Sequence, residues 1–150
     1  VAELRGMAQV FSKKIGQLYS PTCRADLGDD RCGIDLTAIS VKGVVQTVHS
    51  QRSFTDPARI QLDGWFRNGL LSWTSGANAG LCMEVRSFAD GRFELFLPMA
   101  RTIAPGDGYE VQAGCNKLIT TCRDKFANAA AFRGEPHVPG NDFLTRGAGG

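Results

Sequence analysis

Apolar residues near the start of the chain repeat at helical spacing. They recur at steps of three and four residues, which places them on one face of an amphipathic helix; they are Leu4, Met7, Ala8, Phe11, Ile15 and Leu18. Lys13 and Lys14 fall off this face, and two lysines are too few for a helix that lies on a membrane surface. We therefore expect a packing or connector helix over residues 1–19.

The middle of the chain changes to a pattern of short strands. Runs rich in Val, Ile, Phe and Trp alternate with Gly, Asn, Asp and Pro. Asp90-Gly91 predicts a tight hairpin turn, because both residues tolerate positive φ. The expected strands cover residues 41–48, 58–62, 70–74, 81–88, 92–97 and 109–112. About six antiparallel strands are enough for a small sheet or a partly closed barrel.

Two segments that flank this region have a different character. Residues 20–33 contain Pro, Gly and paired Asp, which predicts a loop or a broken helix. Residues 115–126 are expected to be helical, and residues 128–142 to form an irregular, Pro- and Gly-bounded segment. The predicted fold class is therefore α+β and β-rich, with an antiparallel sheet or partly closed barrel flanked by N- and C-terminal helical and loop segments that carry cysteines.

Composition narrows the class of protein. The 150 residues suffice for one domain with a core, and 43% hydrophobic with 21% charged residues excludes general disorder. No apolar run approaches the roughly 18 residues of a membrane span. A net charge of +2 gives no reason to expect specific nucleic-acid binding or an anionic membrane as partner.

The two ends suggest a piece of a longer protein. The chain opens on Val1 in what reads as the interior of a helix, and it closes on the flexible sequence Gly147-Ala148-Gly149-Gly150. We expect a connector helix from a missing N-terminal domain over residues 1–19, one domain over residues 20–146, and a flexible tail over residues 147–150.

The five cysteines are the unusual feature of the composition. Cys23 and Cys32 form an early pair, Cys115 and Cys122 form a late pair, and the two pairs flank the β-rich middle. A step of seven residues on a helix would place Cys115 and Cys122 on one face. A step of nine residues would place Cys23 and Cys32 on opposite faces of a helix. The loop at Gly28 must therefore bend for the two thiols to reach one point. Four thiols that converge from the two sides of a domain are typical of a metal site.

Spacing alone leaves four interpretations of these thiols open. Disulfides would leave one cysteine over in a domain large enough to stand without them. Structural zinc normally uses C-x2-C knuckles, which neither pair has. Free cysteines are often simply buried. An iron–sulfur cluster is a larger object that accepts ligands from widely spaced turns.

An enzymatic alternative needs a nucleophile. Cys82 with His49 or His137 and Asn141 is the combination available for a Cys–His hydrolase. Nothing around Cys82 indicates the helix N-terminus that would lower its pKa, and we expect a buried strand residue instead. We therefore predict that the protein is not an enzyme.

Carbohydrate chemistry is the other alternative. Glu84 and Glu94 on facing strands could imitate a glycosidase pair, although solvent-facing charges are commoner there. Trp65 and Trp73 could line a sugar-binding face of a host-recognition module, but core or interface packing is the usual role of such residues.

The two cysteine segments resemble a known family. The matching residues are Gly114-Cys115-Asn116-Lys117, Thr121-Cys122-Arg123, Phe132-Arg133-Gly134 and Pro136-His137 through Asn141-Asp142, together with Thr22-Cys23 through Leu27-Gly28 and Cys32-Gly33. They resemble the C-terminal domain of the phage-type tail-tip or baseplate hub proteins, a conserved phage family of unknown function that includes hub proteins of gene transfer agents. That family is similar to the minor tail protein L of lambda-like phages.

This resemblance implies a cofactor and its ligands. The lambda-like relative carries a [4Fe–4S] cluster on four cysteines, which implies Cys23, Cys32, Cys115 and Cys122 as the iron ligands here. The cluster would cross-link the domain in a reducing cytoplasm, where disulfides do not persist. Arg133 or His137 could donate hydrogen bonds toward it, although a locally fixed turn is the simpler interpretation of that segment.

The resemblance also implies a place of action. It points to a structural component of the tail tip of a virion or phage-like particle, assembled in the bacterial cytoplasm. The implied partners are other hub copies in a trimeric or higher ring, the distal tail protein, and a central tip or receptor-binding protein.

Overall fold

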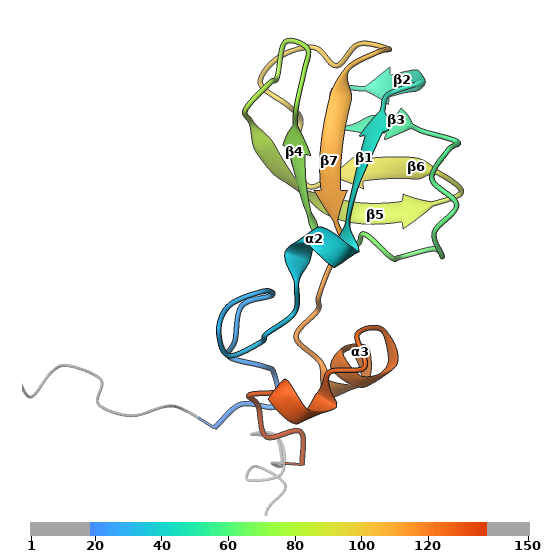
Figure 1. Ribbon diagram of the computed structural model, residues 1–150. Coiled ribbons are helices and arrows are strands. Elements are labelled where there is room, and N and C mark those ends of the chain that lie inside the picture. The colour runs from blue at the N-terminus through green and yellow to red at the C-terminus, as the bar shows by residue number, and fades with distance from the viewer. Residues whose placement is uncertain (1–18, 138–150) are drawn as a thin grey trace, which may run out of the picture.

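The computed structural model describes residues 19–137. A curled sheet forms one region, and loops with short helices form a second region below it (Figure 1). The elements in chain order are α2 (Leu36–Ile39), β1 (Ser40–Val44), β2 (Thr47–Ser50), β3 (Ser53–Thr55), β4 (Leu70–Trp73), β5 (Cys82–Ala89), β6 (Arg92–Leu95), β7 (Gly108–Gln112), α3 (Ile119–Asp124) and the 3₁₀ helix η1 (Ala129–Ala131). Apart from Tyr19, the helix expected over residues 1–19 lies outside the described residues, as does the tail at 147–150.

The seven strands form one antiparallel sheet in the order β1-β7-β4-β5-β6-β3-β2. The two outermost strands, β1 and β2, follow each other in the chain with only Val45 and Gln46 between them. The sheet therefore curls back on itself into a half-barrel, which we define as residues 40–113. The α+β, β-rich prediction is confirmed.

Three strand assignments differ from the expected ones by more than a shift of one or two residues at an end. The run 41–48 splits into β1 and β2, because Val45 turns into the core and its N–H donates to the carbonyl of Asp107 at 2.9 Å. Residues 58–62 form no strand, and Ile60 and Leu62 are exposed in a loop. The short strand β3 was not predicted; it is polar at both ends, so only its pairing between β2 and β6 identifies it.

The hairpin predicted at Asp90-Gly91 is present between β5 and β6. Asp90 has φ 48° and Gly91 has φ 71°, the positive values that a two-residue turn of this kind requires. A Cβ on Gly91 would lie 2.7 Å from the carbonyl oxygen of Asp56, so a side chain is excluded on steric grounds as well.

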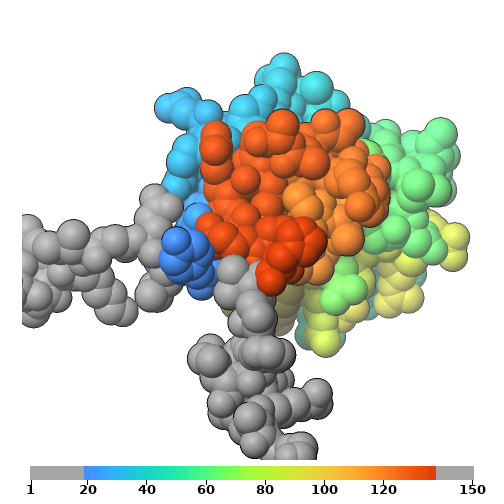
Figure 2. Space-filling model, turned by 90° about the horizontal axis from the view of Figure 1, so that it is seen from below, coloured from blue at the N-terminus to red at the C-terminus, as the bar shows by residue number. Residues whose placement is uncertain are grey.

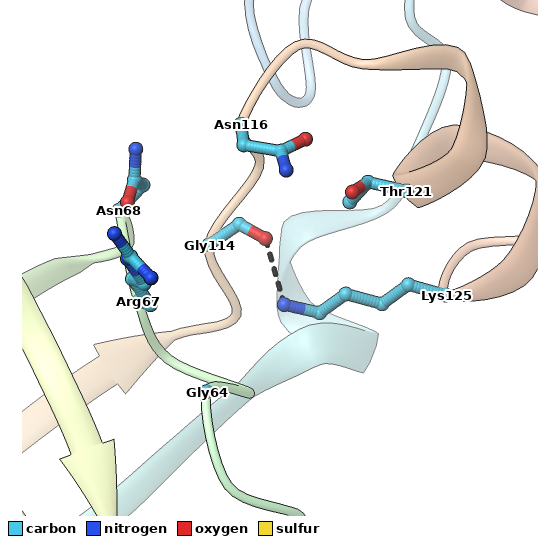
Figure 3. A pocket seen from close by; sticks show the side chains of 7 residues that line it. All are labelled: Gly64, Arg67, Asn68, Gly114, Asn116, Thr121 and Lys125. Atoms are coloured by element: carbon cyan, nitrogen blue, oxygen red, sulfur yellow. Dashed lines mark hydrogen bonds between the residues drawn. The ribbon is translucent and has the colours of Figure 1, made fainter.

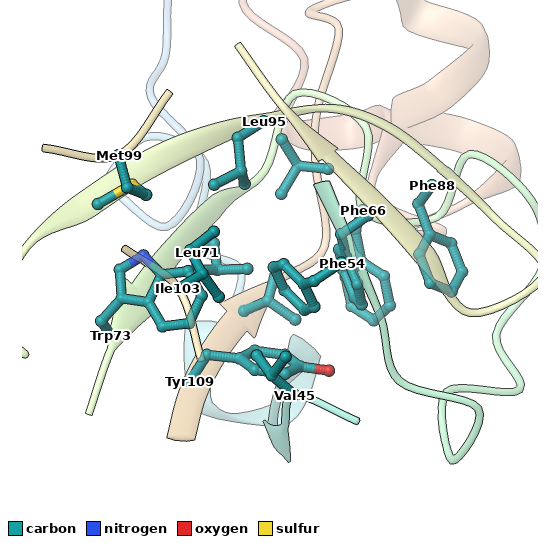
Figure 4. Packing of buried hydrophobic residues seen from close by; sticks show 13 residues of the cluster. Val45, Phe54, Phe66, Leu71, Trp73, Phe88, Leu95, Met99, Ile103 and Tyr109 are labelled. Atoms are coloured by element: carbon teal, nitrogen blue, oxygen red, sulfur yellow. The ribbon is translucent and has the colours of Figure 1, made fainter. Parts of the chain in front are cut away.

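The core of the half-barrel is aromatic (Figure 4). Phe93 is fully buried, with ring centroids 5.1 Å from Phe54, 4.7 Å from Phe88 and 5.4 Å from Tyr109. The Tyr109 hydroxyl donates to the buried carboxylate of Asp56 at 2.6 Å. These rings come from strands β3, β5, β6 and β7 and fill the concave side of the sheet.

The second region consists of residues 19–35 and 114–137, which we call the cysteine module. Helix α2 joins it to the half-barrel, and the Asp35 side chain caps this helix by accepting the N–H of Thr37 at 2.9 Å. At the seam between the two regions, the Gly114 N–H donates to the carbonyl of Trp65 at 3.1 Å. In the described part of the chain, no helix has the length and apolar character needed to cross a membrane.

Candidate functional site: the cysteine module

Four of the five cysteines lie around one pocket. Cys23, Cys32, Cys115 and Cys122 line it together, among apolar side chains that include Leu27, Ile34, Leu118, Phe126 and Phe132. All four are free thiols; Cys122 is buried and the other three are half-buried. Figure 2 looks onto the module from below, where residues 115–137 lie beside the early segment. Two segments far apart in sequence thus bring four sulfurs to one place.

Backbone hydrogen bonds join these two segments. The Cys23 N–H donates to the carbonyl of Lys117 at 2.8 Å, and the Arg24 N–H donates to the carbonyl of Arg133 at 3.1 Å. The Glu135 N–H donates to the carbonyl of Ser20 at 2.8 Å. The early cysteine segment is therefore held between the two parts of the late one.

The loop of the early pair bends at Gly28, as its spacing predicted. Gly28 has φ 82°, and a Cβ there would collide with the Leu36 side chain at 2.5 Å. The Asp29 carboxylate then closes the loop by accepting the N–H groups of Asp26 at 3.0 Å and Cys32 at 2.7 Å. The N–H of Asp26, with that of Cys32, lowers the pKa of Asp29 to about 2.

The late pair does not lie on one helix, contrary to the prediction. Helix α3 begins at Ile119, so it carries Cys122 but not Cys115. Lys117 has φ 64°, and this left-handed residue turns the chain between the two cysteines. Cys115 therefore reaches the pocket from the segment that leaves β7, and Cys122 reaches it from the helix.

The sulfur atoms differ in their hydrogen bonding. The N–H groups of Arg133 and Lys117 each donate at 3.4 Å, to Cys23 and Cys115 respectively. Arg133 thus donates to a sulfur through its backbone N–H. The Cys122 thiol instead donates to the carbonyl of Asn128 at 3.1 Å. Burial, followed by the three neighbouring cysteines, raises the pKa of Cys122.

Side chains outside the predicted set tie the module together. Arg24 and Glu135 form a two-pronged ion pair at 2.6 and 2.7 Å. The Asn128 side chain donates to the carbonyl of Cys32 at 2.7 Å, and the Lys117 ammonium pairs with Asp26 at 2.9 Å. Sequence reasoning missed these partners, because pairs about 90 to 110 residues apart carry no local signal.

The described residues do not form a site for a single metal ion. Between Tyr19 and His137, no group of three or more His, Cys, Asp or Glu side chains is placed to hold one ion. The free space between the four thiols is about 20 Å³, room for roughly one water. Zinc would need all four sulfurs at about 2.3 Å from one point. A larger group would need more room than this pocket now provides.

Cys82 is not among the residues that line this pocket. It begins β5, and it is exposed rather than buried as expected. It hydrogen-bonds to Ser72 at 3.1 Å, while His49 bonds to Thr55 at 2.8 Å. Within the described range, the structure therefore pairs neither residue as a Cys–His hydrolase requires. Asn141, the third member of that alternative, lies outside the range.

Three of the residues considered for carbohydrate chemistry have packing or ion-pair roles in the fold. Trp73 is 2% exposed and belongs to the core, so it offers no sugar-stacking face. Trp65 is half-buried and packs against the core, with the Lys125 ammonium 4.8 Å from its ring centroid. Glu94 is paired with Arg52 at 2.8 Å, which makes it a structural charge rather than one of two free catalytic carboxylates.

Comparison with known proteins gives three findings. Residues 64–142 match a family described as phage conserved hypothetical protein BR0599. Residues 1–35 match the N-terminal attachment domain of baseplate hub proteins. A chain from a solved structure described as the virion of a native gene transfer agent particle is 34% identical, with a TM-score of 0.74.

The extent of the structural match is unequal for the two chains. It covers 93% of this chain and 50% of the virion chain, so the sequence spans about half the length of that relative. No curated protein matches the sequence. The early cysteine pair falls within one family match and the late pair within the other.

Proposed function

Because the chain belongs to the family of the phage conserved protein BR0599, we propose that it is a structural component of a phage-like tail tip or baseplate hub in which four cysteines hold a [4Fe–4S] cluster. The hub role is supported by the match to the hub attachment domain and by the similarity to a chain of the gene transfer agent virion. Its place of action would be the tail tip of the particle.

One observation carries the cluster part of the proposal. Cys23, Cys32, Cys115 and Cys122 line a single pocket as free thiols, in a region that has almost no apolar core of its own. Four thiolates are the usual ligand set of a [4Fe–4S] cluster, whose irons stand apart and accept more widely spaced sulfurs than one zinc ion does. The apolar side chains around the thiols would keep water from such a group.

The residues around the cysteines have a positioning role in this proposal. Two backbone N–H groups already point at the sulfurs of Cys23 and Cys115, and such hydrogen bonds stabilise thiolates. Cys122 would give up its bond to Asn128 when it deprotonates to bind iron. When bound, the cluster supplies four iron–sulfur bonds that cross-link the chain. We assign it a structural role.

The cross-link would join the two segments that the family models match. The segment matched to the hub attachment domain ends at residue 35, and the other match begins at residue 64. We propose residues 20–146 as one hub domain, with the cysteine module as the joint between the attachment segment and the half-barrel. The proposed partners are other copies of the hub in a ring, the distal tail protein, and a central tip or receptor-binding protein.

The test is metal analysis of the full chain purified without oxygen. We expect four irons and four sulfides per chain and a brown protein. Cys115→Ser should lose most of the iron, because it removes a ligand. Cys82→Ser is the matched control and should keep the iron, since Cys82 is exposed on β5.

Two outcomes would overturn the cluster while leaving the hub role open. One is a colourless chain with stoichiometric zinc. The other is an iron content that falls equally in the Cys82 and Cys115 variants. Failure of the purified chain to join hub particles in a reconstituted tail would count against the hub role itself.

A further inference from the structure

A polar pocket lies at the seam between the half-barrel and the cysteine module. Its volume is about 300 Å³. Figure 3 shows Arg67 and Asn68 on the half-barrel side, with Asn116, Thr121 and Lys125 on the module side. The pocket is separate from the space between the four thiols, and none of the five cysteines lines it.

Several hydrogen-bond donors at this pocket are unused. Asn116 accepts the N–H of Leu118 at 3.1 Å through its side-chain oxygen, and its amide NH₂ has no acceptor in the part of the chain that the structure describes. Within residues 19–137, the side chains of Arg67, Asn68 and Thr121 make no hydrogen bond or ion pair. No carboxylate is among the residues that line the pocket in this range. This excess of hydrogen-bond donors in the pocket favours a ligand whose polar atoms are all hydrogen-bond acceptors.

Lys125 fixes a positive charge at the wall of the pocket. Its ammonium group donates to the carbonyl oxygens of Gly114, at 2.7 Å, and Trp65. An ammonium has three hydrogens, so one is left. Its nitrogen also lies 4.8 Å from the Trp65 ring centroid and 5.2 Å from that of Phe126. The cation is therefore held in place before any ligand arrives.

A second pocket of about 260 Å³ on the half-barrel provides the contrast. Two arginines line it as well, but Arg52 is paired with Glu94 at 2.8 Å and Arg92 donates to Ser53 at 3.1 Å. One of its two positive charges is thus compensated by a carboxylate, and the other arginine already donates to a serine hydroxyl. Among residues 19–137, the Arg67 side chain has neither an ion pair nor a hydrogen-bond acceptor, and this difference singles out the pocket at the seam.

We propose that the seam pocket binds an oxyanion group, a carboxylate or a phosphate. Arg67 offers a planar fork that can grip two oxygens of such a group at once. Asn116 and Thr121 would donate to the remaining oxygens from the opposite wall. A bound oxyanion would contact both regions of the molecule and hold the cysteine module against the half-barrel.

The experiment is an NMR titration of the full chain with inorganic phosphate and, separately, with acetate. Sodium chloride at matched ionic strength serves as the baseline. We expect the amide signals of residues 67–68, 114–116 and 121 to shift and saturate with at least one of the two anions. Arg67→Gln should weaken binding about tenfold, the effect of losing a charge-assisted bidentate contact.

Two further variants sharpen the test. Asn116→Asp keeps the oxygen that accepts the Leu118 N–H but adds a negative charge, so it should abolish binding without unfolding the turn. Arg101→Gln removes an exposed arginine outside the pocket and should bind like the parent chain. Saturation with phosphate alone would indicate a phosphate-bearing ligand, and saturation with acetate alone would indicate an acidic side chain. Shifts no larger than those caused by chloride, or equal affinity in the Arg67 variant, would overturn the proposal.

Discussion

The half-barrel and the cysteine module are stabilised by different means. In the half-barrel, buried aromatic and aliphatic side chains from five strands and the connecting loops fill one continuous core. In the described part of the module, the buried apolar residues are Ala25 and Cys122, and the longest regular element is the six-residue helix α3. The module is held by backbone hydrogen bonds, ion pairs and the arrangement of its four thiols.

This difference indicates which region can remain folded through hydrophobic burial alone. A core of the size seen in the half-barrel is the dominant stabilising term in folding. A loop-rich region without such a core usually needs disulfides or a metal group to remain folded. The four clustered cysteines lie in the region that lacks a core, and this coincidence is the physical basis of the proposed cross-link.

Removal of a core ring should have the largest effect. Phe93→Ala deletes a fully buried ring that packs against four other aromatic rings. We expect a loss of about 3–5 kcal/mol in the free energy of unfolding, measured by urea denaturation followed by far-UV circular dichroism. Phe96→Ala is the control, because Phe96 is 45% exposed. Equal losses in the two variants would contradict the assignment of the core.

Removal of the proposed cluster should act on the module alone. Treatment with an iron chelator under reducing conditions should speed amide hydrogen exchange about tenfold or more in residues 20–33 and 115–135, because local opening then lacks the cross-link. Strands β4 to β7 should keep their protection, since their hydrogen bonds do not depend on the thiols. Uniform loss of protection across both regions would show that they are not separate units of stability.

The smallest expected effect concerns the ion pair that closes the module. The Arg24 guanidinium, with the N–H of Ser20, lowers the pKa of Glu135 from 4.5 to about 2. The stabilising effect of this carboxylate is therefore present above about pH 4.5 and is lost as the pH falls toward 2. Glu135→Gln should lower the melting temperature slightly at pH 7, and the difference from the parent chain should vanish near pH 2.

A matched variant separates this effect from general acid denaturation. Glu84→Gln changes an exposed strand residue and should follow the parent chain at every pH. A melting-temperature difference for Glu135→Gln that stays constant from pH 7 to pH 2 would contradict the assigned role of the ion pair.

Local sequence signals predicted local structure well. Asp90-Gly91 identified the β5–β6 hairpin, because few residues other than Gly, Asn and Asp accept positive φ at both turn positions. Short runs rich in Val, Ile, Phe and Trp between turn residues identified most of the strands, such as β5. This pattern failed at residues 58–62, where Ile60 and Leu62 are apolar and yet exposed in a loop.

The spacing of the cysteines gave a partly correct picture of the site. It required a bend at Gly28, which the structure contains. It also placed Cys115 and Cys122 on one helix, which is wrong, because Lys117 interrupts the segment with a positive φ. The prediction that Cys82 is buried is wrong, because its side chain is exposed. Residues of β5 alternate between two faces, and the strands that pair with it decide which face points into the core.

The amino-acid order by itself determined the class of fold, the hairpin and the division of the chain into a β-rich middle with cysteines on both sides. These follow from periodicity and backbone preference, which act between neighbours in the chain. Tertiary structure decided the rest: that four thiols share one pocket, that Arg24 meets Glu135 and Asn128 meets Cys32, and that Arg67 faces Lys125 across a seam. Such contacts join residues tens to more than a hundred positions apart, and only the folded path of the backbone brings them together.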